Sequence, residues 1–194
     1  MKRILFIIGS IFLAMTGAAG ASAQQSAADS PKPPPLVMTT TAFEDGGVIP
    51  GKYTLKTAVS PELKWAQVPA GTKSFVLYVH DPDVAMEKST RDVLHWLVWN
   101  IPGAATGLPE GISQGDELSD GSRQVSLRTH GYLGPGAPAT GPYHHYIFEL
   151  YALNTMLDIP AGTPEESAAT LAQVMKAING HIWGKAVLVG RFHK

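Results

Sequence analysis

The residues best suited to chemistry begin with a histidine and a tyrosine on one strand-like segment. His144 and Tyr146 open the strand-like segment 144–153. Side chains two residues apart on a strand point to the same face, so an imidazole and a phenol share one face at one strand end.

A second histidine and an aspartate stand at the ends of two other apolar segments. His95 lies at the start of a strand-like run, where alternation places it on one face with Leu97 and Trp99. Asp81 directly follows another such run, 74–80. Polar groups at the ends of apolar strands are well placed to form the mouth of a pocket.

Such a pocket would combine two imidazoles, a hydroxyl and a carboxylate. The imidazoles and the hydroxyl donate hydrogen bonds, and the carboxylate can fix a ring tautomer or meet a cationic part of a ligand. This chemistry suits a phosphate or carboxylate group. Spacing alone leaves separate structural roles open, because Asp81-Pro82-Asp83 is also an ordinary turn. We assign structural roles to His80, His130 and His145.

Two other chemistries are weaker. Gly111-Ile-Ser-Gln-Gly115 matches the G-x-S-x-G pattern, but that pattern has meaning only on a strand-to-helix turn, and here it lies in a polar stretch. A metal site could combine His95, His144 and Asp81, yet the sequence has no H-E-x-x-H motif. We therefore predict no catalytic residue, no metal and no cofactor.

The first residues predict export. Lys2 and Arg3 precede an apolar run of about a dozen residues, shorter than the roughly 20 that span a bilayer, and Ala21-Ser-Ala23 suits signal peptidase. We expect a signal peptide at 1–23, cleavage after Ala23, and a periplasmic or secreted protein without stable membrane insertion. An uncleaved membrane anchor is the alternative.

The remaining chain reads as a tether and one domain. Residues 24–35 are rich in Gln, Ser, Ala and Pro and predict a disordered, Pro-rich tether. Residues 36–194 are enough for one domain, and the chain has no cysteine, so the fold does not rely on disulfides. Cleavage of the signal peptide would remove Lys2 and Arg3, which leaves 13 of the 15 basic residues against 16 acidic ones. This balance argues against binding of nucleic acid.

The domain is predicted to be mostly β. Seven strand-like runs are separated by Gly, Pro and Asp and favour an antiparallel sheet or sandwich: 36–43, 63–68, 74–80, 94–101, 123–129, 144–153 and 185–192. The runs 74–80 and 94–101 are apolar on both faces, which predicts central strands.

One helix and one long loop complete the prediction. Thr163-Pro-Glu-Glu166 supplies a capping box and a first-turn proline, Ala168, Leu171, Met175 and Ile178 follow at helical spacing, and Gly180 ends the segment. We expect this helix to pack on the sheet. The stretch 103–121 is polar and rich in glycine, and predicts a surface loop.

Three motifs resemble the phosphatidylethanolamine-binding protein family. They are Asp81-Pro-Asp-Val84, His95-Trp-Leu-Val-Trp-Asn-Ile-Pro102, and Gly131-Tyr-Leu-Gly-Pro135 together with His144-His-Tyr146. More narrowly, they resemble the bacterial branch called Raf-kinase-inhibitor-like proteins, from about Leu36 to the C-terminus. The resemblance implies a β-sandwich of a large antiparallel sheet and a smaller sheet, with peripheral helices.

The resemblance also implies a ligand site. Asp81, His95, His144 and Tyr146 would line a small anion site for phosphate-like or phosphoethanolamine groups. A second group would shape its rim or support it: Gly134, Pro135, Pro138 and Asp83. The sequence departs from the family pattern at Ala85, at Gly136-Ala-Pro138, and at His145, where the family usually has an arginine. An imidazole cannot supply that permanent charge.

The expected function is therefore binding of a small anion or a phospholipid head group without turnover. Inhibition of a protein partner, such as a kinase or protease, and a weak hydrolase activity are the alternatives. Whether the protein forms a homodimer is left open by the sequence.

Overall fold

The computed structural model describes residues 35–194. The predicted signal peptide (1–23) and tether (24–35) lie outside the described residues, apart from Pro35. Within residues 35–194, no helix combines the length and the apolar character needed to cross a membrane.

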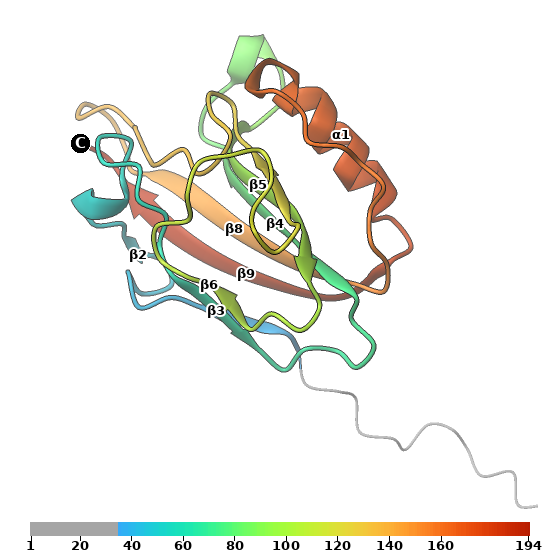
Figure 1. Ribbon diagram of the computed structural model, residues 1–194. Helices are drawn as coiled ribbons and strands as arrows, with labels where there is room; N and C mark the ends of the chain where they lie inside the picture. Colours follow the sequence, from blue (N-terminus) through green and yellow to red (C-terminus); the bar gives the residue numbers. More distant parts are fainter. Residues whose placement is uncertain (1–34) are drawn as a thin grey trace, which may run out of the picture. The chain divides into compact units, whose positions relative to one another are not determined.

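Two β-sheets form the core of the domain (Figure 1). The smaller sheet has three strands in the order β1 (Val37–Thr39), β3 (Leu63–Ala66) and β6 (Gly107–Leu108). The larger sheet has six, in the order β2 (Gly47–Val48), β9 (Ile182–Phe192), β8 (His144–Leu153), β4 (Ser74–Asp81), β5 (Val93–Pro102) and β7 (Arg123–Val125). All neighbouring pairs are antiparallel except β2 and β9.

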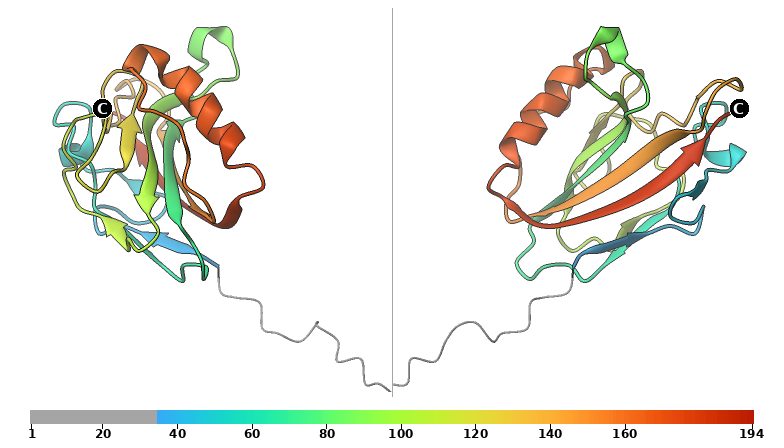
Figure 2. Two further views of the ribbon diagram at one scale, coloured as in Figure 1. Left: turned by 45° about the vertical axis from the view of Figure 1, so that its right-hand side comes forward. Right: turned by 180° about the vertical axis from the view of Figure 1, so that it is seen from behind.

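The larger sheet is covered on its two faces by different elements. Figure 2 shows the helix α1 (Ser167–Ala177) on one side of this sheet and the smaller sheet on the other. Two apolar clusters fill these layers. Phe75, Trp96 and Phe148 belong to the cluster against the smaller sheet, whereas Val76 and Trp99 belong to the cluster against α1.

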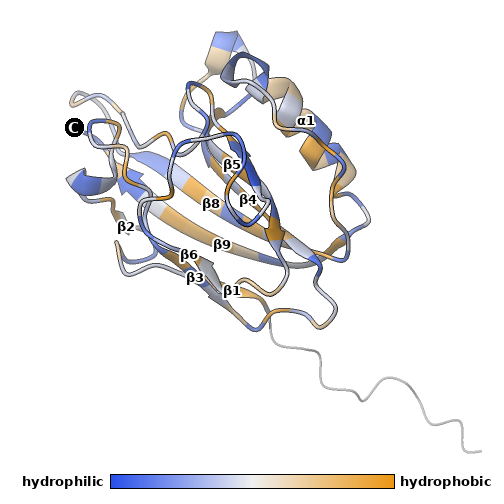
Figure 3. Cartoon of the chain, viewed as in Figure 1, coloured by the Kyte–Doolittle hydropathy of each residue, from blue (hydrophilic) through white to orange (hydrophobic). Residues whose placement is uncertain are grey.

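Alternation along the strands creates these two clusters. Both faces of β4 are buried over its whole length, which explains its uninterrupted apolar sequence. Figure 3 shows apolar residues concentrated along the strands of the larger sheet. Burial of both faces fixes the strand register, because a shift by one residue would exchange the two side-chain sets.

The sequence prediction of a mostly β sandwich with a large and a small sheet is confirmed. The runs 74–80 and 94–101 are strands inside the larger sheet, as predicted. Two short strands, β2 and β6, were not predicted, because two residues are too few to show alternation. The stretch 103–121 is a loop apart from β6.

The helix begins at the predicted capping box. Thr163 and Glu166 form the reciprocal contacts, and a 3-10 turn at Pro164–Glu166 leads into α1. The buried face is shifted from the predicted one: Ala168 is exposed and Leu171 and Met175 are half-buried, whereas Thr170, Val174 and Ile178 are buried.

The capping box predicts a measurable stability effect. Thr163→Ala removes the side-chain acceptor for the first turn and should lower the free energy of unfolding by about 1 kcal/mol. Urea unfolding measures this difference. Thr90→Ala is the matched control, since Thr90 is exposed and caps no helix. Equal stability of the two variants would contradict the assigned cap.

Candidate anion-binding pocket

A cavity of about 260 Å³ opens where the ends of β4, β5 and β8 meet the loop that follows β7. It contains all four residues that were expected to line a shared site: Asp81, His95, His144 and Tyr146. The rest of its lining is mainly apolar: Leu55, Val84, Met86, Val93, Leu127, Arg128, Leu133, Gly134, Gly136, Ala137 and Pro138.

Asp81 is the buried anchor of the pocket. It ends β4, is only 2% exposed, and its Oδ2 accepts a hydrogen bond from His144 Nδ1 at 2.8 Å. Its Oδ1 accepts the backbone N–H of Asp83 at 2.9 Å. A buried carboxylate is costly unless it is paired and hydrogen-bonded, and both oxygens of Asp81 are satisfied in this way.

The contact with Asp81 fixes the orientation of His144. Because a carboxylate accepts, His144 Nδ1 carries the proton, and Nε2 is left for a ligand. The strand pairing supports this arrangement. His80 of β4 lies opposite Ile147 of β8, which brings the end of β4 beside the start of β8.

His95 reaches the pocket through a β-bulge. Val79 pairs with Trp96 and His80 pairs with Leu94, so His95 is an extra residue on β5. The expectation that His95 shares a face with Leu97 and Trp99 is therefore wrong. Those two residues belong to the cluster against α1.

The bulge turns the His95 ring toward the tyrosine of β8. The rings of His95 and Tyr146 meet edge to face, with centroids 5.0 Å apart. His95 Nδ1 donates to the Leu133 carbonyl at 2.6 Å, and the His95 carbonyl accepts the Leu133 N–H at 2.8 Å. His95 therefore also leaves Nε2 as its free nitrogen, as His144 does.

Burial shifts the pKa values of His95 and Tyr146, whose rings meet in the pocket. Burial lowers the pKa of His95 below the ordinary histidine value, so its ring is neutral near neutral pH. Burial, together with the nearby Asp81 carboxylate, raises the pKa of Tyr146 to about 12. The phenol therefore keeps its proton and can donate a hydrogen bond.

The three predicted rim residues lie differently with respect to the cavity. Gly134 and Pro138 line the cavity, but Pro135 does not. Pro135 is buried behind the rim, and its carbonyl accepts the N–H of Leu55 at 2.8 Å.

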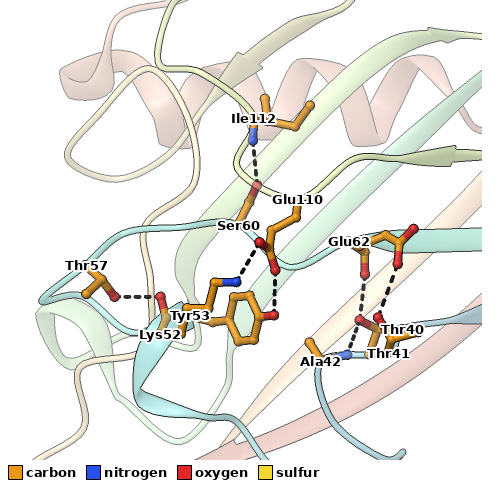
Figure 4. Close-up of polar contacts among 10 residues, drawn as sticks. All are labelled: Thr40, Thr41, Ala42, Lys52, Tyr53, Thr57, Ser60, Glu62, Glu110 and Ile112. Carbon is orange, nitrogen blue, oxygen red and sulfur yellow. Dashed lines mark hydrogen bonds and ion pairs between the residues drawn. The ribbon is translucent and has the colours of Figure 1, made fainter.

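Leu55 belongs to a segment held in place by polar contacts on its far side. Figure 4 shows Lys52 and Tyr53 both bound to Glu110, and Ser60 bound to the N–H of Ile112. These contacts join residues 51–62 to the loop that follows β6. They position Leu55 as a wall of the pocket.

Asp83 supports the pocket from outside. Its Oδ2 accepts the backbone N–H of His145 at 2.6 Å and lies 3.0 Å from His145 Nδ1. Although partial burial acts to raise it, these hydrogen bonds hold the pKa of Asp83 below its ordinary value. Neither residue lines the cavity, so Asp83 ties the turn after β4 to the start of β8.

The sequence did not point to Leu55, Met86 or Arg128, which also line the cavity. Leu55 and Arg128 come from irregular segments and Met86 begins a 3-10 turn, Met86–Lys88. Neither alternation nor a motif marks such positions. Arg128 is the only cationic side chain of permanent charge in the cavity lining among the described residues.

The structure also shows where the residues of the possible hydrolase motif and the possible metal site lie. Ser113 of the G-x-S-x-G pattern is exposed in a loop that no helix follows, so it lacks the geometry of a nucleophile elbow. Within residues 35–194, no three His, Cys, Asp or Glu side chains are grouped to hold a metal ion.

Comparison with known proteins decides the family. The profile described as Phosphatidylethanolamine-binding protein matches residues 39–193. The chain belongs to this family. It is 39% identical over 160 residues to a UPF0098 protein of Methanothermobacter thermautotrophicus, covering 81% of this chain and 98% of that one.

Solved structures agree with this assignment. A phosphatidylethanolamine-binding protein homologue from Chlamydia trachomatis is 31% identical, with a TM-score of 0.66 over 82% of this chain and 98% of that chain. YbcL from E. coli shares the fold, with 24% identity and a TM-score of 0.67 over the same shares. The narrower Raf-kinase-inhibitor-like branch stays a prediction.

The rim predicts a steric test of the pocket. A methyl group at Gly134 would lie 2.3 Å from the carbonyl carbon of Thr54 and 2.6 Å from the Leu55 nitrogen. Gly134→Ala should therefore lower the free energy of unfolding by about 1–3 kcal/mol, measured by urea unfolding.

Gly136→Ala is the matched control on the same rim. Its added methyl group would approach only the side chain of Leu55, with a nearest distance of 3.1 Å. A flexible side chain can move aside, so this variant should keep most of its stability. Equal losses at the two positions would contradict the close backbone approach at Gly134.

Proposed function

We propose that the protein is an exported binding protein that holds a small anion, or the anionic group of a phospholipid, in the pocket around Asp81. Membership in the phosphatidylethanolamine-binding family supports ligand or protein binding in general. The observation that carries the finer proposal is the pair of histidines whose Nδ1 atoms are both engaged, so that both Nε2 atoms are left for one ligand.

The tautomers determine how an anion binds. When the rings are neutral, His95 Nε2 and His144 Nε2 are hydrogen-bond acceptors, and an anion offers them no donor. An anion therefore binds well when a proton is taken up by a ring, or when the ligand brings its own proton. Tyr146 contributes a hydroxyl donor under both conditions.

The lining of the cavity favours binding over covalent catalysis. It contains a His–Asp pair of the kind that activates nucleophiles, but no serine, threonine or cysteine among the described residues. Its apolar side, which includes Leu55, Met86 and Leu133, suits a ligand with a hydrocarbon part next to its anionic group. Inhibition of a protein partner gains no comparable support.

His144→Ala should abolish binding of inorganic phosphate and phosphoethanolamine in titration calorimetry, because it removes one Nε2 and leaves Asp81 without its partner. His145→Ala is the matched control, since the neighbouring ring on the same strand lies outside the cavity. Retained affinity in His144→Ala would refute the proposed function.

The affinity should also depend on pH. Burial lowers the pKa of His95 in the free protein, and a bound anion favours the protonated ring and raises it. Binding therefore takes up a proton, and the affinity rises as the pH falls below about 6.5, the ordinary histidine value. Sulfate is the probe, because it stays doubly charged over this range. A flat sulfate profile would contradict proton uptake by the histidines, because sulfate has no proton to donate to a neutral ring.

A further inference from the structure

One charged side chain in the pocket lining, Arg128, has no role in the proposed function as described above. Arg128 lines the cavity, and after burial, the main cause, its positive charge makes a small contribution to the lowered pKa of His95. It comes from the segment after β7, whereas His144 begins β8. A role for Arg128 at this site rests on the proposed function.

Arg128 differs from the other arginines in residues 35–194. Arg91 pairs with Glu87, Arg123 pairs with Glu117 and donates to the Ile159 carbonyl, and Arg191 donates to the Gly46 carbonyl. None of the ion pairs in this part of the chain includes Arg128. Its guanidinium group is therefore available to a ligand.

The backbone around Arg128 is held in place. Leu127 donates its N–H to the Leu94 carbonyl at 3.1 Å, which ties the segment to β5. On the other side, the N–H and the hydroxyl of Ser126 both bind the Thr129 carbonyl, at 2.8 and 3.0 Å. Arg128 thus sits on an anchored turn, so only its side chain needs to be ordered on binding.

Within residues 35–194, no other group of permanent positive charge lines the cavity. The ring of His145, next to His144, pairs with Asp83 outside the cavity. Burial lowers the pKa of His95, so this ring supplies no positive charge to the pocket near neutral pH. A guanidinium group remains charged at any such pH, and its planar fork matches two oxygens of one phosphate or carboxylate.

We propose that Arg128 contacts the bound anion directly and is the residue that gives the pocket affinity for oxyanions at neutral and alkaline pH. Other titratable groups surround it on two sides. Asp81, His95, His144 and Tyr146 line the same cavity, and Asp116 and His130 line a neighbouring hollow that Arg128 also borders. Asp116 is the competing partner, and among the described residues it forms no ion pair with Arg128 in the free protein.

The test compares sulfate binding by the full domain and its Arg128→Gln variant. At about pH 8, where histidines of ordinary pKa are neutral, the variant should bind sulfate about 10- to 100-fold more weakly, the loss expected for charge-assisted hydrogen bonds. At about pH 5 the difference should be smaller, because protonated imidazoles then supply the charge. Arg128→Lys should lose less than Arg128→Gln at the higher pH.

Arg91→Gln is the matched control, since Arg91 is an exposed arginine outside this cavity, and it should bind sulfate as the unchanged protein does. If Arg128→Gln binds sulfate normally at about pH 8 while His144→Ala does not bind, the role of Arg128 is refuted and the proposed function stands. If the unchanged protein binds no sulfate at any pH, both are refuted. A loss that is equal at the two pH values would indicate a structural effect and also overturn the assignment.

Discussion

The pairing of the buried Asp81 carboxylate with His144 is the interaction on which the rest of the site depends. It satisfies one oxygen of a charge that would otherwise be costly to bury, and it fixes the tautomer and orientation of an imidazole. The pairing requires the end of β4 to lie beside the start of β8, which the register of the two central strands provides. The fold therefore positions the dyad through strand pairing, while the turn contact between Asp83 and His145 holds the same corner from outside.

A second constraint brings His95 to the same place. Strict alternation would put its ring against α1, and the bulge at His95 reverses that direction. The two contacts between His95 and Leu133 then attach the glycine-rich rim to β5. Each imidazole thus has one nitrogen committed to the protein and one left for the cavity. This arrangement links binding of an anion in the pocket to protonation of the histidine rings.

The sequence predicted the regular parts of this structure better than the irregular ones. Strand-like runs bounded by Gly, Pro and Asp identified β4, β5 and β8, and the resemblance brought together Asp81, His95, His144 and Tyr146. The sequence could not reveal the bulge, because an extra residue leaves no mark in the pattern of β5. It also could not show that Pro135 lies behind the rim and outside the cavity lining. Leu55 and Arg128 were missed because they reach the cavity from loops whose paths depend on contacts distant in sequence, such as those of Glu110 and Leu94.

The central claim is that both pocket histidines carry their proton on Nδ1 and present Nε2 to the ligand. Nitrogen-15 NMR of histidine-labelled protein distinguishes the two ring nitrogens directly. In the free protein, at a pH where both rings are neutral, His95 and His144 should show a protonated Nδ1 and an unprotonated Nε2, and Nε2 of at least one ring should gain a proton when sulfate is added. A free protein in which either ring is protonated on Nε2 instead of Nδ1 would contradict the account.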